Sequence, residues 1–240
     1  MTPVEPWRPR ARIGAIVAVL LWIGASGGLA ESQDVPDVDL ALVLAVDCSY
    51  SVDSVEFRLQ MQGLAAALRD PQVADAIATG PTGRIAVTLF QWSAYNSQKI
   101  VIPWTVISSG ADAASLADDI EVARRLTLES ATSISAAIEF GAALLAHIPA
   151  RPLRRVIDVS ADGSNNNGRE PGIARDWAIE KAITITGLAI INEVPYLDSY
   201  FKRHVTGGPG NFVMVANDYQ AYRDAILRKL ILEILGATTS

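Results

Sequence analysis

An unbroken apolar run from Leu40 to Val46 constrains the fold of this 240-residue chain more than any other feature. A strand that is half exposed alternates apolar and polar residues, whereas a strand covered on both faces is apolar throughout. The run therefore predicts a central parallel strand over Val38–Val46. Open α/β folds bind their ligands at the carboxyl edge of the sheet, so the residues that follow this strand are candidates for a site.

Those residues carry three oxygen side chains on alternating positions, Asp47, Ser49 and Ser51. One carboxylate and two hydroxyls on one short loop can converge on a hard divalent cation. A single negative ligand leaves the cation electrophilic toward an oxygen from outside. By its composition alone the Asp-x-Ser-x-Ser pattern has little specificity, and its position after a buried strand gives it weight.

Two later segments supply further oxygen atoms. Thr132 precedes an apolar helical stretch, which predicts its hydroxyl at the start of a helix. The segment from Val156 to Gly163 reads as a strand that ends in Asp-Gly, so Asp162 is expected at the same sheet edge as Asp47. With no His or Cys at metal-ligand spacing, an all-oxygen site favours Mg²⁺, with Mn²⁺ and Ca²⁺ as alternatives. The predicted metal ligands are Asp47, Ser49, Ser51, Thr132 and Asp162.

This set resembles the metal-ion-dependent adhesion site of von Willebrand factor A domains. The resemblance of the chain to these domains covers roughly residues 37–235. The chain looks closest to a secreted bacterial branch of uncharacterised function. The resemblance implies that the serines and the threonine contact the metal directly or through water. It implies that the aspartates supply charge and orientation. An open coordination position would then accept a Glu or Asp carboxylate from a partner protein. This chain differs from the family pattern at Tyr50, at Ser130-Ala131 and at Asp158, a charge within an apolar strand.

Each predicted ligand also has an ordinary structural interpretation. The hydroxyls of Ser49, Ser51 and Thr132 are typical helix caps, and Asp162-Gly163 is a typical turn. The loop at 163–168, Gly-Ser-Asn-Asn-Asn-Gly, is either a determinant of specificity beside the metal or a solvated turn.

The first 30 residues have the tripartite pattern of a secretory signal peptide, with three arginines, an apolar stretch over 13–23 and small residues up to Ala30. We expect cleavage after Ala30, a short lead-in over 31–37, a single domain over 38–236, and a periplasmic or secreted location. An uncleaved membrane anchor is the alternative, although the apolar stretch is short for a span of about 20 residues.

Composition excludes several classes of partner. The formal net charge is −6, and the leader contributes three arginines against one glutamate, so the rest is more acidic still. An acidic domain without a basic run predicts neither nucleic-acid binding nor attraction to anionic lipid. Cys48 is the only cysteine, so no intramolecular disulfide can form, and we expect it to be a small buried side chain and not a reactive thiol.

The other patterns predict strands that alternate with helices, and hence an α/β fold with a doubly wound, mostly parallel sheet and one antiparallel edge hairpin. Asp53 and Glu56 form a capping-box pattern before a helix marked by Phe57, Met61, Leu64 and Leu68, which Asp70-Pro71 ends or interrupts. Further strands are expected over 84–92, 98–106, 153–160, 183–191 and 212–215. Further helices are expected over 113–124, from 132 through Ile148, over 173–182 and from Tyr222 to Ile234.

Together these features predict a secreted, cation-dependent binding module for a protein partner, without enzymatic activity. The rival hypothesis is a metal-dependent phosphoryl-transfer hydrolase that uses Asp47 as a nucleophile or metal ligand. Such enzymes need a lysine electrophile and a second aspartate at the position that Ser49 occupies here. A third hypothesis is a metal-free structural domain. His147 and His204 adjoin no nucleophile, so a Ser-His-Asp hydrolase is poorly supported.

Overall fold

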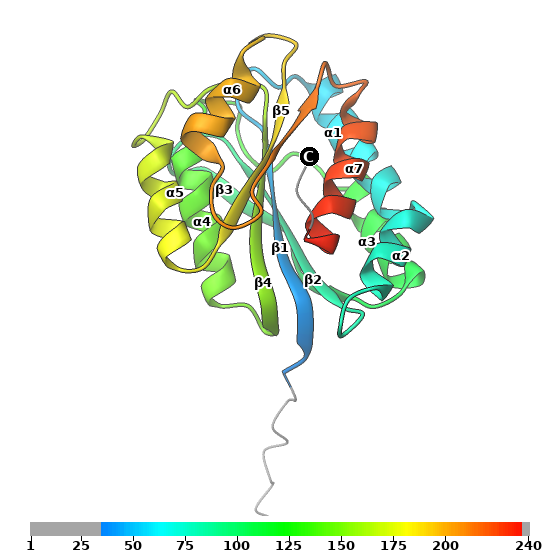
Figure 1. The fold of residues 1–240 in the computed structure, drawn as a ribbon. Helices are drawn as coiled ribbons and strands as arrows, with labels where there is room; N and C mark the ends of the chain where they lie inside the picture. The colour runs from blue at the N-terminus through cyan, green and yellow to red at the C-terminus, as the bar shows by residue number, and fades with distance from the viewer. Residues whose placement is uncertain (1–34, 237–240) are drawn as a thin grey trace, which may run out of the picture. The chain divides into compact units, whose positions relative to one another are not determined.

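The computed structural model describes residues 35–236, in which a six-stranded sheet lies between two layers of helices (Figure 1). The strand order is β3-β2-β1-β4-β5-β6, and all neighbours are parallel except β2 and β3. This confirms the predicted α/β class and its antiparallel edge hairpin. The predicted signal peptide and residues 31–34 of the lead-in lie outside the described residues. The strands are β1 (Asp37–Asp47), β2 (Ile85–Trp92), β3 (Gln98–Ile107), β4 (Arg151–Ala161), β5 (Thr184–Ile190) and β6 (Val213–Ala216).

The apolar run of β1 is continuous because its two faces belong to two different cores. Leu42 and Leu44 pack with the helices α1, α3 and α7, whereas Val43 and Ala45 pack with α4 and α5 on the opposite face (Figure 1). Burial on both faces removes the alternation that a half-exposed strand would show. The helices are α1 (Ser54–Leu68), α2 (Pro71–Ala78), α3 (Gly110–Glu121), α4 (Ile134–Ala146), α5 (Pro171–Glu180), α6 (Leu197–Tyr200) and α7 (Tyr222–Leu235).

The capping box predicted at the start of α1 is present. The Asp53 side chain accepts hydrogen bonds from the N–H groups of Val55 and Glu56, and the Glu56 side chain accepts one from the Asp53 N–H. Asp70-Pro71 ends α1 as predicted, but it also begins α2, which the sequence analysis missed. Asp70 caps α2 and Pro71 is its first residue, where proline loses no hydrogen bond.

The segment between β5 and β6 was also missed. It contains α6 and a π-helical segment, η1 (Phe201–Val205), which together are too short to show helical periodicity. Phe201 is fully buried against Gly187 of β5, where an added Cβ would lie only 2.4 Å from the Phe201 ring. The ring therefore occupies the space that any larger residue at position 187 would need. Within residues 35–236, no helix has the length and hydrophobicity needed to cross a bilayer.

Asp158 on β4, whose partner the sequence did not reveal, forms a buried ion pair with Lys229 of α7. The Lys229 Nζ lies 2.8 Å from Asp158 Oδ1, and it also donates to Thr186 Oγ1 at 2.8 Å and to Glu233. Lys229 is completely buried, and Asp158, Thr186 and Glu233 are 2 % exposed. This polar cluster joins α7 to the neighbouring strands β4 and β5.

Candidate metal centre

The loop after β1 connects to the end of β4 through a chain of hydrogen bonds. The Ser49 N–H donates to Asp47 Oδ1 at 2.7 Å, and the hydroxyls of Ser49 and Ser51 are 3.2 Å apart. Ser51 Oγ then donates to Asp162 Oδ1 at 2.6 Å. Because β1 and β4 are parallel neighbours, both loops leave the same edge of the sheet. The structure thus brings four of the predicted ligands together.

The fifth predicted ligand, Thr132, lies beside this group on the loop before α4. Its Oγ1 would be 3.9 Å from a Cβ built on Gly163, the residue after Asp162. The loop is tied to the first one by a 2.7 Å bond from the Tyr50 N–H to the Ser130 carbonyl. The expectation that Thr132 starts the helix was wrong: α4 begins at Ile134, and Ser133 is its N-cap. The Thr132 hydroxyl is therefore not used as a cap.

The three asparagines of the loop at 163–168 bond to three different segments beside the centre. Asn166 Oδ1 accepts from the Thr132 N–H at 2.8 Å, and Asn165 Oδ1 accepts from the Ser135 N–H at 3.3 Å in the first turn of α4. Asn167 Oδ1 accepts from the Tyr95 N–H at 2.8 Å. Ser133 makes no side-chain cap of its own, so Asn165 satisfies a free N–H of α4 from a distant loop. The interpretation of this segment as a merely solvated turn was wrong.

Two buried carboxylates meet at this edge, and no basic side chain of residues 35–236 bonds to either. Asp47 and Asp162 are completely buried, and burial together with the charge of Asp162 raises the pKa of Asp47 to about 8. Asp47 Oδ2 is buried and has no hydrogen-bond partner in the described part of the chain. The nearby Arg125 bonds instead to the carbonyls of Val52, at 2.7 Å, and Ser49, at 3.3 Å. A cation would reduce the repulsion between Asp47 and Asp162 and would give Asp47 Oδ2 a partner. The residues present therefore fit a divalent metal.

The predicted metal ligands include hydroxyl groups as well as carboxylates. Within residues 35–236, no group of three or more His, Cys, Asp or Glu side chains is placed to hold a metal ion. The hard oxygen donors here are two aspartates with Ser49, Ser51 and Thr132, a set that suits Mg²⁺ or Mn²⁺ and offers nothing to a soft cation.

Tyr219, between β6 and α7, is a site residue that the sequence did not reveal. Its hydroxyl donates to Asp162 Oδ2 at 2.9 Å, so both oxygens of Asp162 have donors. Burial and the nearby carboxylates raise the pKa of Tyr219 far above its usual value, which keeps the phenol protonated as a donor. No local pattern around Tyr219 signals this role, because the contact joins positions 57 residues apart.

An open hollow of about 680 Å³ lies over these residues and makes the centre accessible. Ser51 and Thr132 line it, together with Asn166, Glu193 and Tyr50. Tyr50 is 79 % exposed, so its ring extends into solvent and does not fill the centre. A group arriving through this hollow would meet the two hydroxyls before the buried carboxylates.

The fold, with three loops meeting at the carboxyl edge of the sheet, is that of a von Willebrand factor A-like domain, and it resembles a solved structure of a von Willebrand factor type A protein. Residues 37–238 match the family described as "Protein of unknown function (DUF1194)". The chain therefore belongs to this family. Among proteins with curated descriptions, no sequence matches it.

Three solved structures illustrate the likeness. Proximal thread matrix protein 1 from the mussel byssus is 16 % identical, with a TM-score of 0.60 over 83 % of this chain and 49 % of that protein, and it has also been solved with a zinc-occupied MIDAS motif. A von Willebrand factor type A protein from Catenulispora acidiphila is 14 % identical, with a TM-score of 0.52 over 82 % and 43 %. BatB from Bacteroides thetaiotaomicron is 16 % identical, with a TM-score of 0.56 over 81 % and 98 %. The chain thus spans about half the length of the mussel protein.

Proposed function

We propose that this chain is a divalent-cation-dependent protein-binding module that captures an acidic group of a partner protein. The observation that carries the proposal is the pair of buried carboxylates, Asp47 and Asp162, joined through serine hydroxyls, with Asp47 Oδ2 left unpartnered. The mussel protein, which has a similar fold and has been solved with a zinc-occupied MIDAS motif, supports a divalent-cation site in this chain.

In this proposal Ser49, Ser51 and Thr132 hold Mg²⁺ or a similar cation, and Asp47 and Asp162 supply charge and orientation. A metal with few anionic ligands retains affinity for a further oxygen anion, which a Glu or Asp of the partner would supply. Tyr219 and the backbone N–H of Ser49 orient the two aspartates, a contribution that usually matters for metal affinity. Asn166 orients the backbone at Thr132.

The phosphoryl-transfer alternative uses Asp47 either as a metal ligand or as a nucleophile, and a nucleophile has to reach a phosphorus atom. Its side chain is completely buried, and one of its oxygens already accepts the Ser49 N–H. We therefore propose binding and no turnover, and assay of the protein with p-nitrophenyl phosphate and Mg²⁺ tests this. Hydrolysis that is lost in Asp47→Asn would favour the enzyme.

Calorimetry with Mg²⁺ and Mn²⁺ tests the metal site directly. We expect one site in the wild type, its loss in Asp47→Ala and its retention in Asp119→Ala, a matched change at an exposed aspartate of α3. Equal heats for the wild type and Asp47→Ala would overturn the proposal.

We further propose that the protein is exported and cleaved after Ala30, so that it meets its partner outside the cytoplasm. Mass spectrometry of the native protein should find a chain that begins at Glu31 in the soluble envelope fraction. Capture from an envelope extract should then retain a partner with Mg²⁺ and release it with EDTA. A full-length chain fixed in the membrane would contradict the export proposal alone.

A further inference from the structure

The hollow over the candidate metal centre has room for more than one chemical group. Its volume of about 680 Å³ is many times the roughly 30 Å³ that one water molecule occupies in the liquid. A single carboxylate that reached the metal would fill only a small part of this space. The hollow is bounded by four loops, which include the loop after β5. The neighbours of the captured carboxylate would therefore lie against these walls.

Glu193, in the loop after β5, is the one charged side chain among the residues of 35–236 that line the hollow. It is exposed, and within the described part of the chain its carboxylate forms no hydrogen bond or ion pair. Arg125, a basic side chain whose charge acts on Asp47, is paired with Glu129 at 2.8 Å. The hollow thus carries one negative charge that the fold does not neutralise.

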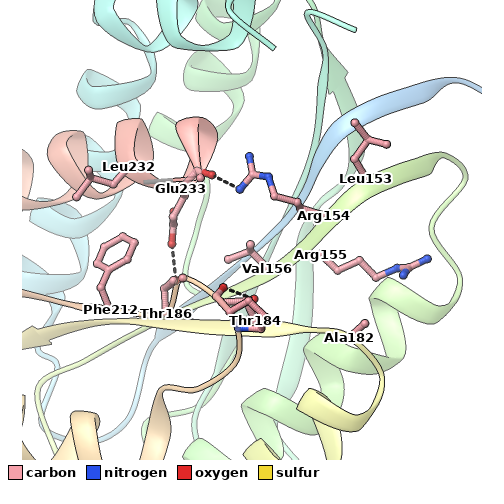
Figure 2. Close-up of a pocket in the computed structure, with 13 residues that line it drawn as sticks. Leu153, Arg154, Arg155, Val156, Ala182, Thr184, Thr186, Phe212, Leu232 and Glu233 are labelled. Carbon is pink, nitrogen blue, oxygen red and sulfur yellow. Dashed lines mark hydrogen bonds between the residues drawn. The ribbon is translucent and has the colours of Figure 1, made fainter. Parts of the chain in front are cut away.

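The cavity at the opposite edge of the sheet differs, because two of its charged side chains are used within the fold (Figure 2). Arg154 donates to the main-chain carbonyls of Glu233 and Ile234, at 2.7 and 2.5 Å, and so caps the end of α7. The Glu233 carboxylate accepts hydrogen bonds from Thr186 and Lys229. Glu193 holds no helix or strand in place in this way, so its charge is available to a ligand.

A carboxylate captured at the metal would meet the charge of Glu193. Two aspartates and one divalent cation sum to zero charge. The captured carboxylate and Glu193 then leave two negative charges in one hollow, on a chain with a formal net charge of −6. Burial raises the pKa of Glu56 at the start of α1, and the charges of Asp162 and Glu193 add to this shift, so carboxylates gather on this rim. Since like charges repel, an acidic residue alone is a poor ligand for the hollow.

We propose, on the basis of the metal-dependent capture proposed above, that the captured segment of the partner carries a basic residue close to its acidic residue. The acidic residue reaches the metal, and the Lys or Arg beside it pairs with Glu193. This ion pair removes the repulsion that an acidic residue alone would meet. The hollow thereby discriminates against segments that are acidic throughout, because Glu193 repels their additional charges.

Two synthetic peptides test the proposal, acetyl-Asp-Gly-Lys-amide and acetyl-Asp-Gly-norleucine-amide. Norleucine keeps the aliphatic stem of lysine without its ammonium. The basic residue stands two positions after the aspartate because residues two apart point to the same side of an extended segment. Titration of the ¹⁵N-labelled protein in Mg²⁺, followed by NMR, should give saturable shifts at residues that line the hollow. We expect the lysine peptide to bind about fivefold more tightly, and added salt to reduce this difference.

Variants at position 193 assign the preference to one side chain. Glu193→Gln should make the two affinities equal, because the lysine peptide loses its ion pair and the norleucine peptide loses the repulsion. Glu193→Lys should reverse the order of the two peptides. Glu180→Gln, the matched change at an exposed position at the end of α5, should keep the fivefold preference. Calorimetry with Mg²⁺ shows that each variant keeps its metal site.

The outcomes separate this inference from the function on which it rests. Equal affinities of the two peptides for the wild type, or an unchanged preference in Glu193→Gln, would overturn the basic residue and leave the cation-dependent module intact. Peptide shifts that persist in EDTA would overturn the proposed function and this inference with it. The absence of saturable shifts from either peptide at millimolar concentration would also overturn both.

Discussion

Ser51 Oγ donates a 2.6 Å hydrogen bond to Asp162 Oδ1, so a hydroxyl and a carboxylate that are 111 residues apart in the sequence are neighbours at one sheet edge. This bond holds the loop after β1 against the end of β4. Both side chains therefore already occupy positions from which a cation can be bound with little rearrangement, and such preorganisation favours affinity.

Thr132→Ala is expected to abolish Mn²⁺ binding with little loss of stability, because the Thr132 hydroxyl does not cap α4. Ser133→Ala is the matched control, since Ser133 Oγ donates to the Asn167 carbonyl at 2.9 Å. It should cost about 1 kcal/mol of unfolding free energy and retain the metal. Calorimetry and urea unfolding separate the two effects. Unfolding of Thr132→Ala, with metal binding intact in the folded fraction, would show that Thr132 is only structural.

Asn166→Ala is expected to destabilise the Thr132 loop, because it leaves the Thr132 N–H without its acceptor. An unsatisfied and poorly hydrated N–H costs about 1–3 kcal/mol. Hydrogen exchange should show faster exchange of the Thr132 amide in this variant, and calorimetry should show weaker Mn²⁺ binding. Asn192→Ala, at an exposed position with one weak hydrogen bond of 3.4 Å, is the control and should match the wild type. Unchanged exchange at Thr132 would contradict the assigned role.

Lys229→Met is expected to destabilise the domain by about 3–5 kcal/mol, since it leaves Asp158 and Glu233 buried without a counter-charge. Adding Asp158→Asn and Glu233→Gln to Lys229→Met removes both charges and should restore part of the loss. Urea unfolding measures each variant. If the triple variant is no more stable than Lys229→Met, the loss comes from packing and not from unpaired charge.

Stability is expected to fall as the pH rises from 5.5 to 8. Burial raises the pKa values of Glu233, to about 7, and of Asp158, so the folded state holds protons more tightly than the unfolded state. The stabilisation is complete below the ordinary pKa of these carboxyls and is lost as the pH passes through the raised value. Each such proton contributes at most about 1.4 kcal/mol per pH unit.

Denaturant unfolding at the two pH values, with EDTA present, measures this slope. The raised pKa of Asp47 acts in the same direction, so Glu233→Gln should reduce the slope without abolishing it. A slope that is flat or of the opposite sign in the wild type would contradict the prediction.

Cys48 is expected not to react with Ellman's reagent in the native protein. Its side chain is fully buried, as the sequence predicted, and burial raises its pKa to about 12. Because the thiolate is the reactive form, labelling should require unfolding. The labelling rate should rise with urea along the unfolding transition, and rapid labelling without denaturant would contradict the buried position.

The sequence by itself determined the features that depend on local pattern. The apolar run into Asp47 predicted a central strand and a site at its end, and Asp53 with Glu56 predicted the start of α1. Asp162 was placed at the same edge because parallel strands end together. These inferences succeed because backbone propensity, helix capping and burial on two faces each produce a sequence pattern within a few consecutive residues.

Only the tertiary structure decided which distant side chains meet. Lys229 pairs with Asp158, Tyr219 bonds to Asp162, and Asn165 caps α4 from another loop. Each contact depends on how a helix or loop lies against the sheet. The packing of both cores determines that position, and no short sequence pattern encodes it. The same packing buries Glu233 Oε2 without a hydrogen-bond partner among residues 35–236, because α7 is held against the sheet by contacts along its length.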